Sequence, residues 1–167
     1  MPARNSDPPA TLTAFPEDSK PQLTEVRERV AEDCPRIRIL SISPNSGDHA
    51  ILGRVLEGLA CEISTAANCR QAAAQLSRER ISVVFSESLL EDGTWKRVLD
   101  LIQKCSNPPL LIVTSLQADE HLWAEVLNIG GYDVVAKPLN PREVRHILTT
   151  ASLWLMHSAT EQIASAG

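Results

Sequence analysis

The sequence has little of what nucleic-acid-binding or membrane proteins use. Lysine and arginine number 16 against 21 aspartates and glutamates, a net charge of −5, so we expect no basic surface and no nucleic-acid partner. No apolar run approaches the roughly 20 residues of a membrane-spanning helix, and the first residues lack the apolar core of a secretory signal. We therefore expect neither a membrane partner nor a signal peptide.

Motifs of metal binding and catalysis are also missing. The chain has no glycine-rich phosphate loop, no nucleophile elbow and no acid–base pair that includes a histidine. No CxxC pair or zinc-site spacing occurs among the four cysteines, Cys34, Cys61, Cys69 and Cys105. We expect four reduced thiols, a cytoplasmic protein, no cofactor, no metal and no enzymatic activity.

What the chain does contain is enough apolar sequence for one domain with a core: 167 residues, 43% of them apolar and 22% charged. Residues 1–35 begin with a Pro- and Ser-rich stretch and should form a disordered or partly helical arm. A domain is expected over residues 36–156. Residues 157–167 are small and polar, and we expect them to form a flexible tail.

Within residues 36–156, five short apolar runs alternate with amphipathic segments. Strands are expected at 37–42, 61–65, 81–87, 108–114 and 132–136, and the last helix at about 141–156. The connections are short and show no hairpin signature. This order predicts an α/β fold with a doubly wound parallel sheet and helices on both faces.

Three stretches resemble the receiver domain of two-component response regulators, the CheY-like family. VVFSESLLEDG (83–93) looks like the family's third strand, which ends in an aspartate and is followed by a Pro-Asp-Gly loop. LIVTS (111–115) looks like its fourth strand with a switch hydroxyl, and GGYDVVAKP (130–138) looks like its fifth strand with Lys-Pro. The resemblance covers about residues 36–156 and implies a flavodoxin-like sheet of order 2-1-3-4-5 in a bacterial signalling protein.

The resemblance also implies a phosphoryl-transfer site, which this chain keeps only in part. Thr114 and Lys137 match the family's phosphoryl-binding hydroxyl and lysine, and Pro138 would follow a cis peptide bond. Ser43 and Pro44 stand where the family has an acidic pair that binds Mg²⁺, and neither is a good ligand for that ion.

Two further positions depart from the family. Glu87 replaces the acceptor aspartate, and Val134 replaces the aromatic switch residue. A carboxylate that is one methylene longer leaves the in-line geometry of phosphoryl transfer. We therefore predict an atypical receiver, or pseudo-receiver, that is not phosphorylated in the ordinary Mg²⁺-dependent way.

Two interpretations of Glu87 stay open. Its carboxylate could reach Lys137 and Thr114 as a built-in phosphate mimic, or it could form an ordinary ion pair with Lys137 that switches nothing, which we favour. Asp48 is expected in the first turn of a helix, where the helix dipole favours it, rather than as a displaced metal ligand. The histidines are expected to be solvated surface residues.

The partner predicted from the resemblance is a protein, either a histidine kinase or a downstream signalling protein. Aromatic residues make up only 4% of the chain. Two of them, Trp123 and Trp154, fall on the fourth and fifth helices, through which receivers commonly meet partners or form homodimers. Core packing is the simpler interpretation of both tryptophans.

Two other functions remain as alternatives. The chain could be a true phosphoacceptor that uses a non-standard group, with Asp92 the nearest aspartate to the Glu87 position. It could also be a small-ligand-binding flavodoxin-like domain that uses the crevice at the strand ends, because the fold alone does not decide between these functions.

Overall fold

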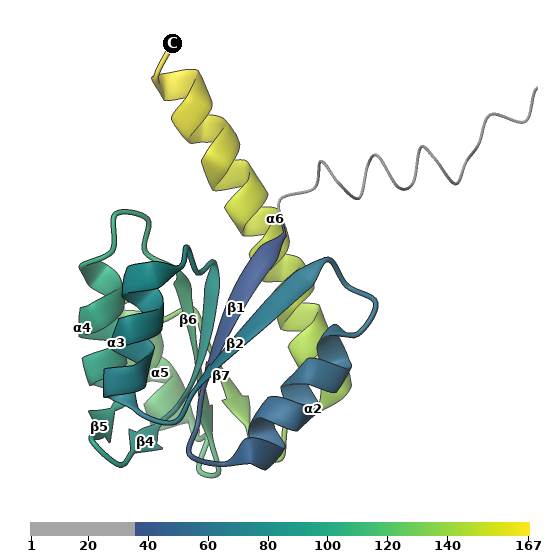
Figure 1. Cartoon of the computed structure of the whole chain (residues 1–167), viewed down its shortest axis with the longest axis vertical. Helices are drawn as coiled ribbons and strands as arrows, with labels where there is room; N and C mark the ends of the chain where they lie inside the picture. The colour runs from purple at the N-terminus through teal and green to yellow at the C-terminus, as the bar shows by residue number, and fades with distance from the viewer. Residues whose placement is uncertain (1–35) are drawn as a thin grey trace, which may run out of the picture. The chain divides into compact units, whose positions relative to one another are not determined.

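A computed structural model describes residues 36–167, and it has the expected parallel sheet. Five parallel strands pair in the order β2-β1-β3-β6-β7, which confirms the predicted order 2-1-3-4-5 (Figure 1). The predicted arm at residues 1–35 lies outside the described residues. The elements are β1 (Ile37–Ile42), α2 (Ser46–Leu56), β2 (Cys61–Ala66), α3 (Cys69–Arg78), β3 (Val83–Glu87), β4 (Leu89–Leu90), β5 (Gly93–Thr94), α4 (Trp95–Gln103), β6 (Leu110–Ser115), α5 (Glu120–Ile129), β7 (Asp133–Ala136) and α6 (Pro141–Ser165).

The sheet has a core on each of its faces. Side chains of β1 and β3 alternate between the two faces, so that Ile39 and Val83 join one core while Leu40 and Val84 join the other. The first core is completed by α2 and α6, and the second by α3, α4 and α5. Because the central strands are buried on both faces, their sequences are continuous apolar runs rather than alternating ones.

Side-chain caps set the starts of four helices. The Oδ1 atoms of Asn45, Asn68 and Asn140 accept hydrogen bonds from the backbone at the starts of α2, α3 and α6, and Asp119 caps α5. The N-cap of α2 is therefore Asn45, and that of α3 is Asn68. Gly130 ends α5 with a φ of 110°, a left-handed conformation that glycine adopts readily.

Some element bounds differ from those expected. The last helix does not stop at Met156, because α6 continues to Ser165; most of the segment predicted to be a flexible tail is therefore helical. The reason is that neither proline nor glycine occurs from Arg142 to Ala166 to end the helix. A short antiparallel pair, β4 and β5, also lies where a loop was expected.

Within residues 36–167, none of the helices combines the length and the apolar character that crossing a membrane requires.

Candidate functional site

The site lies at the carboxyl edge of the sheet, where parallel strands end side by side. Ser43 follows β1, Glu87 is the last residue of β3, and Lys137 follows β7. In the strand register, Ile42 pairs with Ser86 on the neighbouring strand, so the two strand ends lie next to each other. Residues far apart in the chain are therefore brought together by strand order alone, at the crevice where α/β sheets usually hold their sites.

Lys137 bridges two carboxylates at this edge. Its Nζ lies 2.6 Å from Oδ2 of Asp48 and 3.0 Å from Oε1 of Glu87. The three side chains are largely buried, with 8% of Lys137, 13% of Asp48 and 18% of Glu87 exposed. The predicted contact between Glu87 and Lys137 is present. Two carboxylates and one ammonium together carry a net charge of −1.

Ser43 closes the cluster from the β1 side. Its Oγ lies 2.7 Å from Oδ2 of Asp48 and 3.0 Å from Oε2 of Glu87, and it accepts a hydrogen bond from the backbone N–H of Asn45. A hydroxyl has one proton to donate, so the two carboxylates share it. Ser43 thus contributes a neutral hydrogen-bond donor where the family has a negatively charged ligand. We call Ser43, Asp48, Glu87 and Lys137 the carboxylate–lysine cluster.

The cluster holds Lys137 in its charged form. Burial alone would lower the Lys137 pKa, but the hydrogen bonds and negative charges of Asp48 and Glu87 outweigh burial, and the net effect raises that pKa. The ammonium is therefore present throughout the neutral pH range.

Asp48 is a member of the site that the sequence interpretation missed. It lies in the first turn of α2, as predicted, but its carboxylate points into the cluster. Ser43 precedes the N-cap Asn45 by only two residues, so the first turn of α2 lies beside the end of β1 and brings the Asp48 carboxylate to Ser43. A first-turn acid that follows a strand end by a few residues is the signal that could have found it.

His49 is the second residue for which the sequence prediction was wrong. It is not a solvated surface histidine: it is half-buried, with Nδ1 2.7 Å from the Ser41 hydroxyl and Nε2 3.0 Å from the carbonyl oxygen of Ser43. A carbonyl oxygen only accepts, so Nε2 carries the proton of this bond. The imidazole therefore holds the backbone of Ser43 in place through this hydrogen bond to its carbonyl oxygen.

The other predicted site residues surround the cluster without joining it. Thr114 is buried on β6 beside Glu87 in the strand register, and its carbonyl accepts a hydrogen bond from the Ser88 backbone. Among the hydrogen bonds of residues 36–167, none joins the Thr114 side chain to Glu87. Pro138 is exposed and follows a cis peptide bond, as the resemblance implied, and Pro44 is exposed.

Asp92, the alternative phosphoacceptor, belongs to a different part of the molecule. Its two carboxylate oxygens accept hydrogen bonds from the backbone N–H groups of Cys69 and Arg70, at 2.8 and 3.0 Å. The Cys69 bond is the main reason that the Asp92 pKa is lowered. Asp92 thus stabilises the N-terminus of α3 and makes no contact with Lys137.

The residues at this edge do not fit the Mg²⁺ ion that the resemblance implies. Mg²⁺ requires near-octahedral oxygen coordination, usually with carboxylates of the protein. The two carboxylates here already share the Lys137 ammonium, and Ser43 and Pro44 supply no negative charge. Across the described part of the chain, no three His, Cys, Asp or Glu side chains are grouped as metal ligands.

Both candidate interface tryptophans are surface residues, so the core interpretation of them was wrong. Trp123 on α5 and Trp154 on α6 are each about half-exposed, at 50% and 51%. The Trp123 indole N–H donates to Oδ1 of Asp133 on the edge strand β7, at 3.3 Å. In contrast, Trp95, the first residue of α4, is buried in the core.

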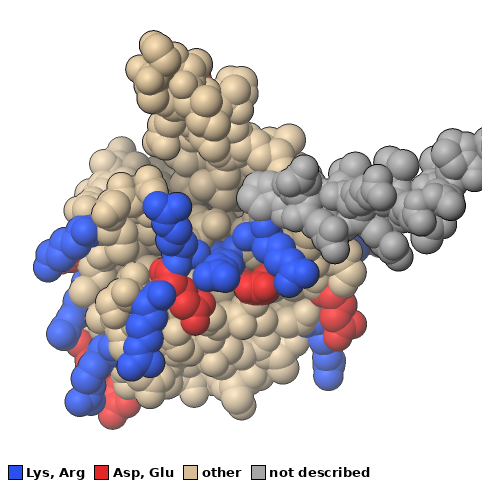
Figure 2. Space-filling model, turned by 45° about the horizontal axis from the view of Figure 1, so that its top comes forward, with Lys and Arg blue, Asp and Glu red and all other residues tan. Residues whose placement is uncertain are grey.

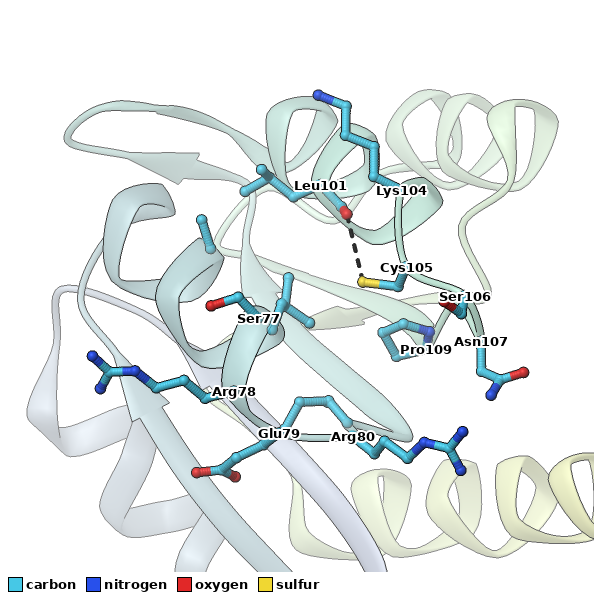
Figure 3. Close-up of a pocket in the computed structure, with 13 residues that line it drawn as sticks. Ser77, Arg78, Glu79, Arg80, Leu101, Lys104, Cys105, Ser106, Asn107 and Pro109 are labelled. Atoms are coloured by element: carbon cyan, nitrogen blue, oxygen red, sulfur yellow. Dashed lines mark hydrogen bonds between the residues drawn. The ribbon is translucent and has the colours of Figure 1, made fainter.

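A cavity of about 480 Å³ lies at the opposite edge of the sheet, before the starts of β3 and β6. Arg78, Arg80 and Lys104 lie at its rim, and their charged ends point away from one another (Figure 3). Arg78 and Lys104 belong to the ends of α3 and α4, where cations stabilise a helix C-terminus. The cavity therefore offers no converging charged groups for a ligand.

Figure 2 shows Lys and Arg interspersed with Asp and Glu on the visible face, rather than gathered in one basic surface.

Comparison with known proteins agrees with this fold. The sequence model described as the response regulator receiver domain matches residues 39–149. A signal receiver domain of a putative LuxO repressor protein from Vibrio parahaemolyticus is similar in structure, with a TM-score of 0.69 and 17% identity over 78% of this chain and 98% of that one.

Two further solved structures are similar. A two-component response regulator from Clostridium difficile has a TM-score of 0.62 and 25% identity, over 72% of this chain and 98% of its own. The chemotaxis response regulator CheY4 of Vibrio cholerae has a TM-score of 0.64 and 18% identity, over 70% and 99%. Because the family model matches well over half of its length, the chain belongs to the response regulator receiver domain family.

Proposed function

We propose that this receiver domain acts through protein–protein contacts in a bacterial two-component or phosphorelay pathway, in the cytoplasm, without catalysis and without ordinary Mg²⁺-dependent phosphorylation. The observation that carries the proposal is the position of Lys137, whose ammonium bridges Asp48 and Glu87. The charged side chains of this site are thereby paired with one another. In an active receiver, a metal ion and the incoming phosphoryl group take part in the corresponding pairs.

The geometry of Glu87 supports this proposal. Phosphoryl transfer depends on an acceptor oxygen that is free and in line with the leaving group. Oε1 of Glu87 accepts from Lys137, and Oε2 faces the Ser43 hydroxyl. Both oxygens of the carboxylate are therefore already engaged.

The same contacts favour a fixed ion pair over a phosphate mimic. A mimic should bind both the lysine and the switch hydroxyl, as a phosphoryl group does. Glu87 instead bonds Lys137 and Ser43, on the β1 side of the sheet. In our proposal Glu87 connects the ends of β1, β3 and β7 through its contacts with Ser43 and Lys137. It does not hold Thr114 in an activated position.

A protein is the proposed partner, either a histidine kinase or a downstream signalling protein. The half-exposed Trp123 and Trp154, on the helices after β6 and β7, support these two helices as the contact surface, since aromatic residues are enriched in interface cores. A homodimer through the same helices remains a prediction.

The two alternatives have less support. For phosphorylation of Asp92, Lys137 of the site is engaged with Asp48 and Glu87, and the Asp92 carboxylate already accepts two backbone hydrogen bonds. For a small-ligand domain, the cavity of about 480 Å³ lies at the sheet edge opposite the strand-end crevice where such a ligand was expected.

The test is incubation of the full chain with acetyl phosphate and Mg²⁺, read by intact mass, with an active receiver in the same reaction as the positive control. We expect no gain of about 80 Da, the mass of one phosphoryl group. A matched variant that rebuilds the family pattern, Ser43→Asp with Pro44→Asp and Glu87→Asp, shows whether the rest of the pocket still supports the reaction. An adduct on the native chain would contradict the proposal, and its loss in Asp92→Asn would establish the first alternative.

A further inference from the structure

The cavity at the amino edge of the sheet has an apolar floor. Its volume of about 480 Å³ lies within the range of roughly 300–1,000 Å³ that binding pockets occupy. Ile81 is 7% exposed, and Leu76 and Leu101 are partly buried against the core behind it. Buried Pro109 and half-buried Cys105 also line the cavity. Such a floor accepts large apolar side chains of a binding partner.

Positively charged side chains surround this floor. Arg78, Arg80 and Lys104 at the rim are exposed, and none of them pairs with an acidic side chain among residues 36–167. The one carboxylate that lines the cavity, Glu79, already accepts a hydrogen bond from the Ser64 hydroxyl. Arg80 lies beyond the end of α3, so stabilisation of a helix C-terminus does not account for it. The rim therefore attracts negative charge.

The starts of two neighbouring strands add to this positive charge. The backbone N–H of Ser82 donates to the carbonyl of Arg38, so the start of β1 lies beside the chain that leaves the cavity. Arg36 and Arg38 share one carboxylate, that of Glu62, at 3.0 and 3.3 Å. The cavity lining and these strand starts together carry five cations and two carboxylates, a net charge of +3. This edge is therefore opposite in sign to the chain as a whole, whose net charge is −5.

We propose that this cavity binds an acidic segment of a partner protein, with apolar side chains on the floor and carboxylates beside the rim. The charged ends of Arg78, Arg80 and Lys104 point away from one another, so they do not converge on one small anion (Figure 3). Carboxylates spaced along a peptide meet cations on different sides of a hollow, and guanidinium groups hold carboxylates by paired hydrogen bonds. An amphipathic helix with apolar anchors three and four residues apart has the required pattern.

Two other occupants fit the cavity less well. Single-stranded nucleic acid binds through bases stacked on aromatic side chains, and none of the described residues that line the cavity is aromatic. A small apolar ligand would fill the floor and make no use of the three cations at the rim.

The inference goes beyond the proposed function. The residues that line the cavity lie between positions 73 and 109, whereas Trp123 and Trp154 belong to α5 and α6. The carboxylate–lysine cluster lies at the other edge of the sheet. We therefore expect this binding whether or not the domain accepts a phosphoryl group.

The probe is a phage-displayed library of random peptides of about 16 residues, or about four helical turns, selected on the full chain. We expect enrichment of peptides that combine Asp or Glu with large apolar side chains three and four residues apart. Synthesised peptides, measured by fluorescence anisotropy, should bind with a Kd on the order of 10–100 µM, because one small cavity and a few screened ion pairs contribute.

A matched pair of charge reversals locates the binding. Arg80→Glu and Arg142→Glu change the net charge equally, and both side chains are exposed, so circular dichroism should stay the same. Arg80→Glu should raise the Kd about tenfold or more, because repulsion replaces attraction at the rim. Arg142→Glu, at the start of α6 beyond the opposite strand ends, should change it less than about twofold, since the strands span roughly 17 Å and salt screens charges beyond about 8 Å.

Cys105 reports on the cavity directly. Its Sγ lines the cavity, 3.7 Å from the Leu101 carbonyl oxygen. A peptide at about three times its Kd should slow alkylation of Cys105 by iodoacetamide about fourfold, since about one quarter of the cavities stays free. The rate for Cys61, which packs against the other core, should not change.

Several results would overturn the proposal. One is a selection that enriches no acidic sequence, whether it enriches nothing or only neutral or basic peptides. Another is a set of acidic peptides that bind Arg80→Glu as tightly as the native chain, or that leave the alkylation of Cys105 unchanged. Protection of Cys105 by a single-stranded oligonucleotide, and not by the peptides, would assign the cavity to nucleic acid instead.

Discussion

Replacement of Lys137 by methionine removes the positive charge from the carboxylate–lysine cluster and leaves a side chain of similar length. In the native protein the cluster carries two carboxylates and one ammonium. In Lys137→Met the carboxylates of Asp48 and Glu87 remain close together on either side of the Ser43 hydroxyl, with a net charge of −2. Both are more than four-fifths buried, so water screens their repulsion only in part.

Removal of one partner of a buried ion pair costs about 3–5 kcal/mol of the free energy of unfolding. The two carboxylates keep some contact with water, which places this variant at the lower end, about 3 kcal/mol. For a domain of this size that loss corresponds to a fall in Tm of roughly 10 °C.

Urea unfolding followed by circular dichroism measures the loss directly. Lys96→Met is the matched control, because Lys96 pairs with Glu125 on the surface, and exposed pairs contribute less than about 1 kcal/mol. Addition of Glu87→Gln to Lys137→Met returns the net charge to −1 and should recover at least about 1 kcal/mol. If Lys137→Met costs no more than Lys96→Met, or if Glu87→Gln recovers nothing, the cluster does not hold the strand ends as we describe.

The pH dependence has a defined sign. The Lys137 pKa is raised above 10.5 in the folded protein, so the stability contributed by its charge is fully present below pH 10.5. That contribution falls as the pH rises through the folded-state pKa. The difference in unfolding free energy between the native chain and Lys137→Met should therefore shrink only in strongly alkaline solution.

Two further predictions concern the core. Gly131→Ala should lower the free energy of unfolding by about 1–3 kcal/mol in a urea titration, because the added Cβ would lie 2.2 Å from Cγ1 of the buried Val126. The control Gly53→Ala, whose Cβ would have nothing within 4 Å, should be neutral or stabilising. Equal effects of the two substitutions would refute the packing argument. Burial, above all, raises the Cys69 pKa to about 11, so its reactive thiolate is on the order of 0.1% of the total at pH 8. Iodoacetamide should therefore label Cys105 before Cys69, as peptide mass spectrometry can show, and faster labelling of Cys69 would contradict its burial.

The helices and strands could be predicted because the physics that sets them is local. A strand buried on both faces must be apolar at successive positions, as Val83 to Phe85 are, and a helix start needs a capping side chain such as Asn68. Family motifs then gave the order of the strands. Glu87 and Lys137 could be paired from sequence because both follow strands of one parallel sheet.

Periodicity and the family motifs did not place Asp48 and His49 in the site. Periodicity places them at the start of α2, but whether a first-turn side chain turns inward depends on the distance between α2 and the end of β7, which lies about 90 positions further along the chain. That distance is a result of packing. The length of α6 was missed for the opposite reason: its apolar pattern fades after Met156, while its small residues remain compatible with a helix.

The bridging lysine has a thermodynamic consequence. A metal ion stabilises the protein that binds it by an amount that depends on the concentration of free ion in the cell. Lys137 is a counterion attached to the polypeptide, so its local concentration beside Asp48 and Glu87 is set by the fold and cannot be diluted. The partial neutralisation of these carboxylates by Lys137 therefore does not vary with the supply of divalent cation.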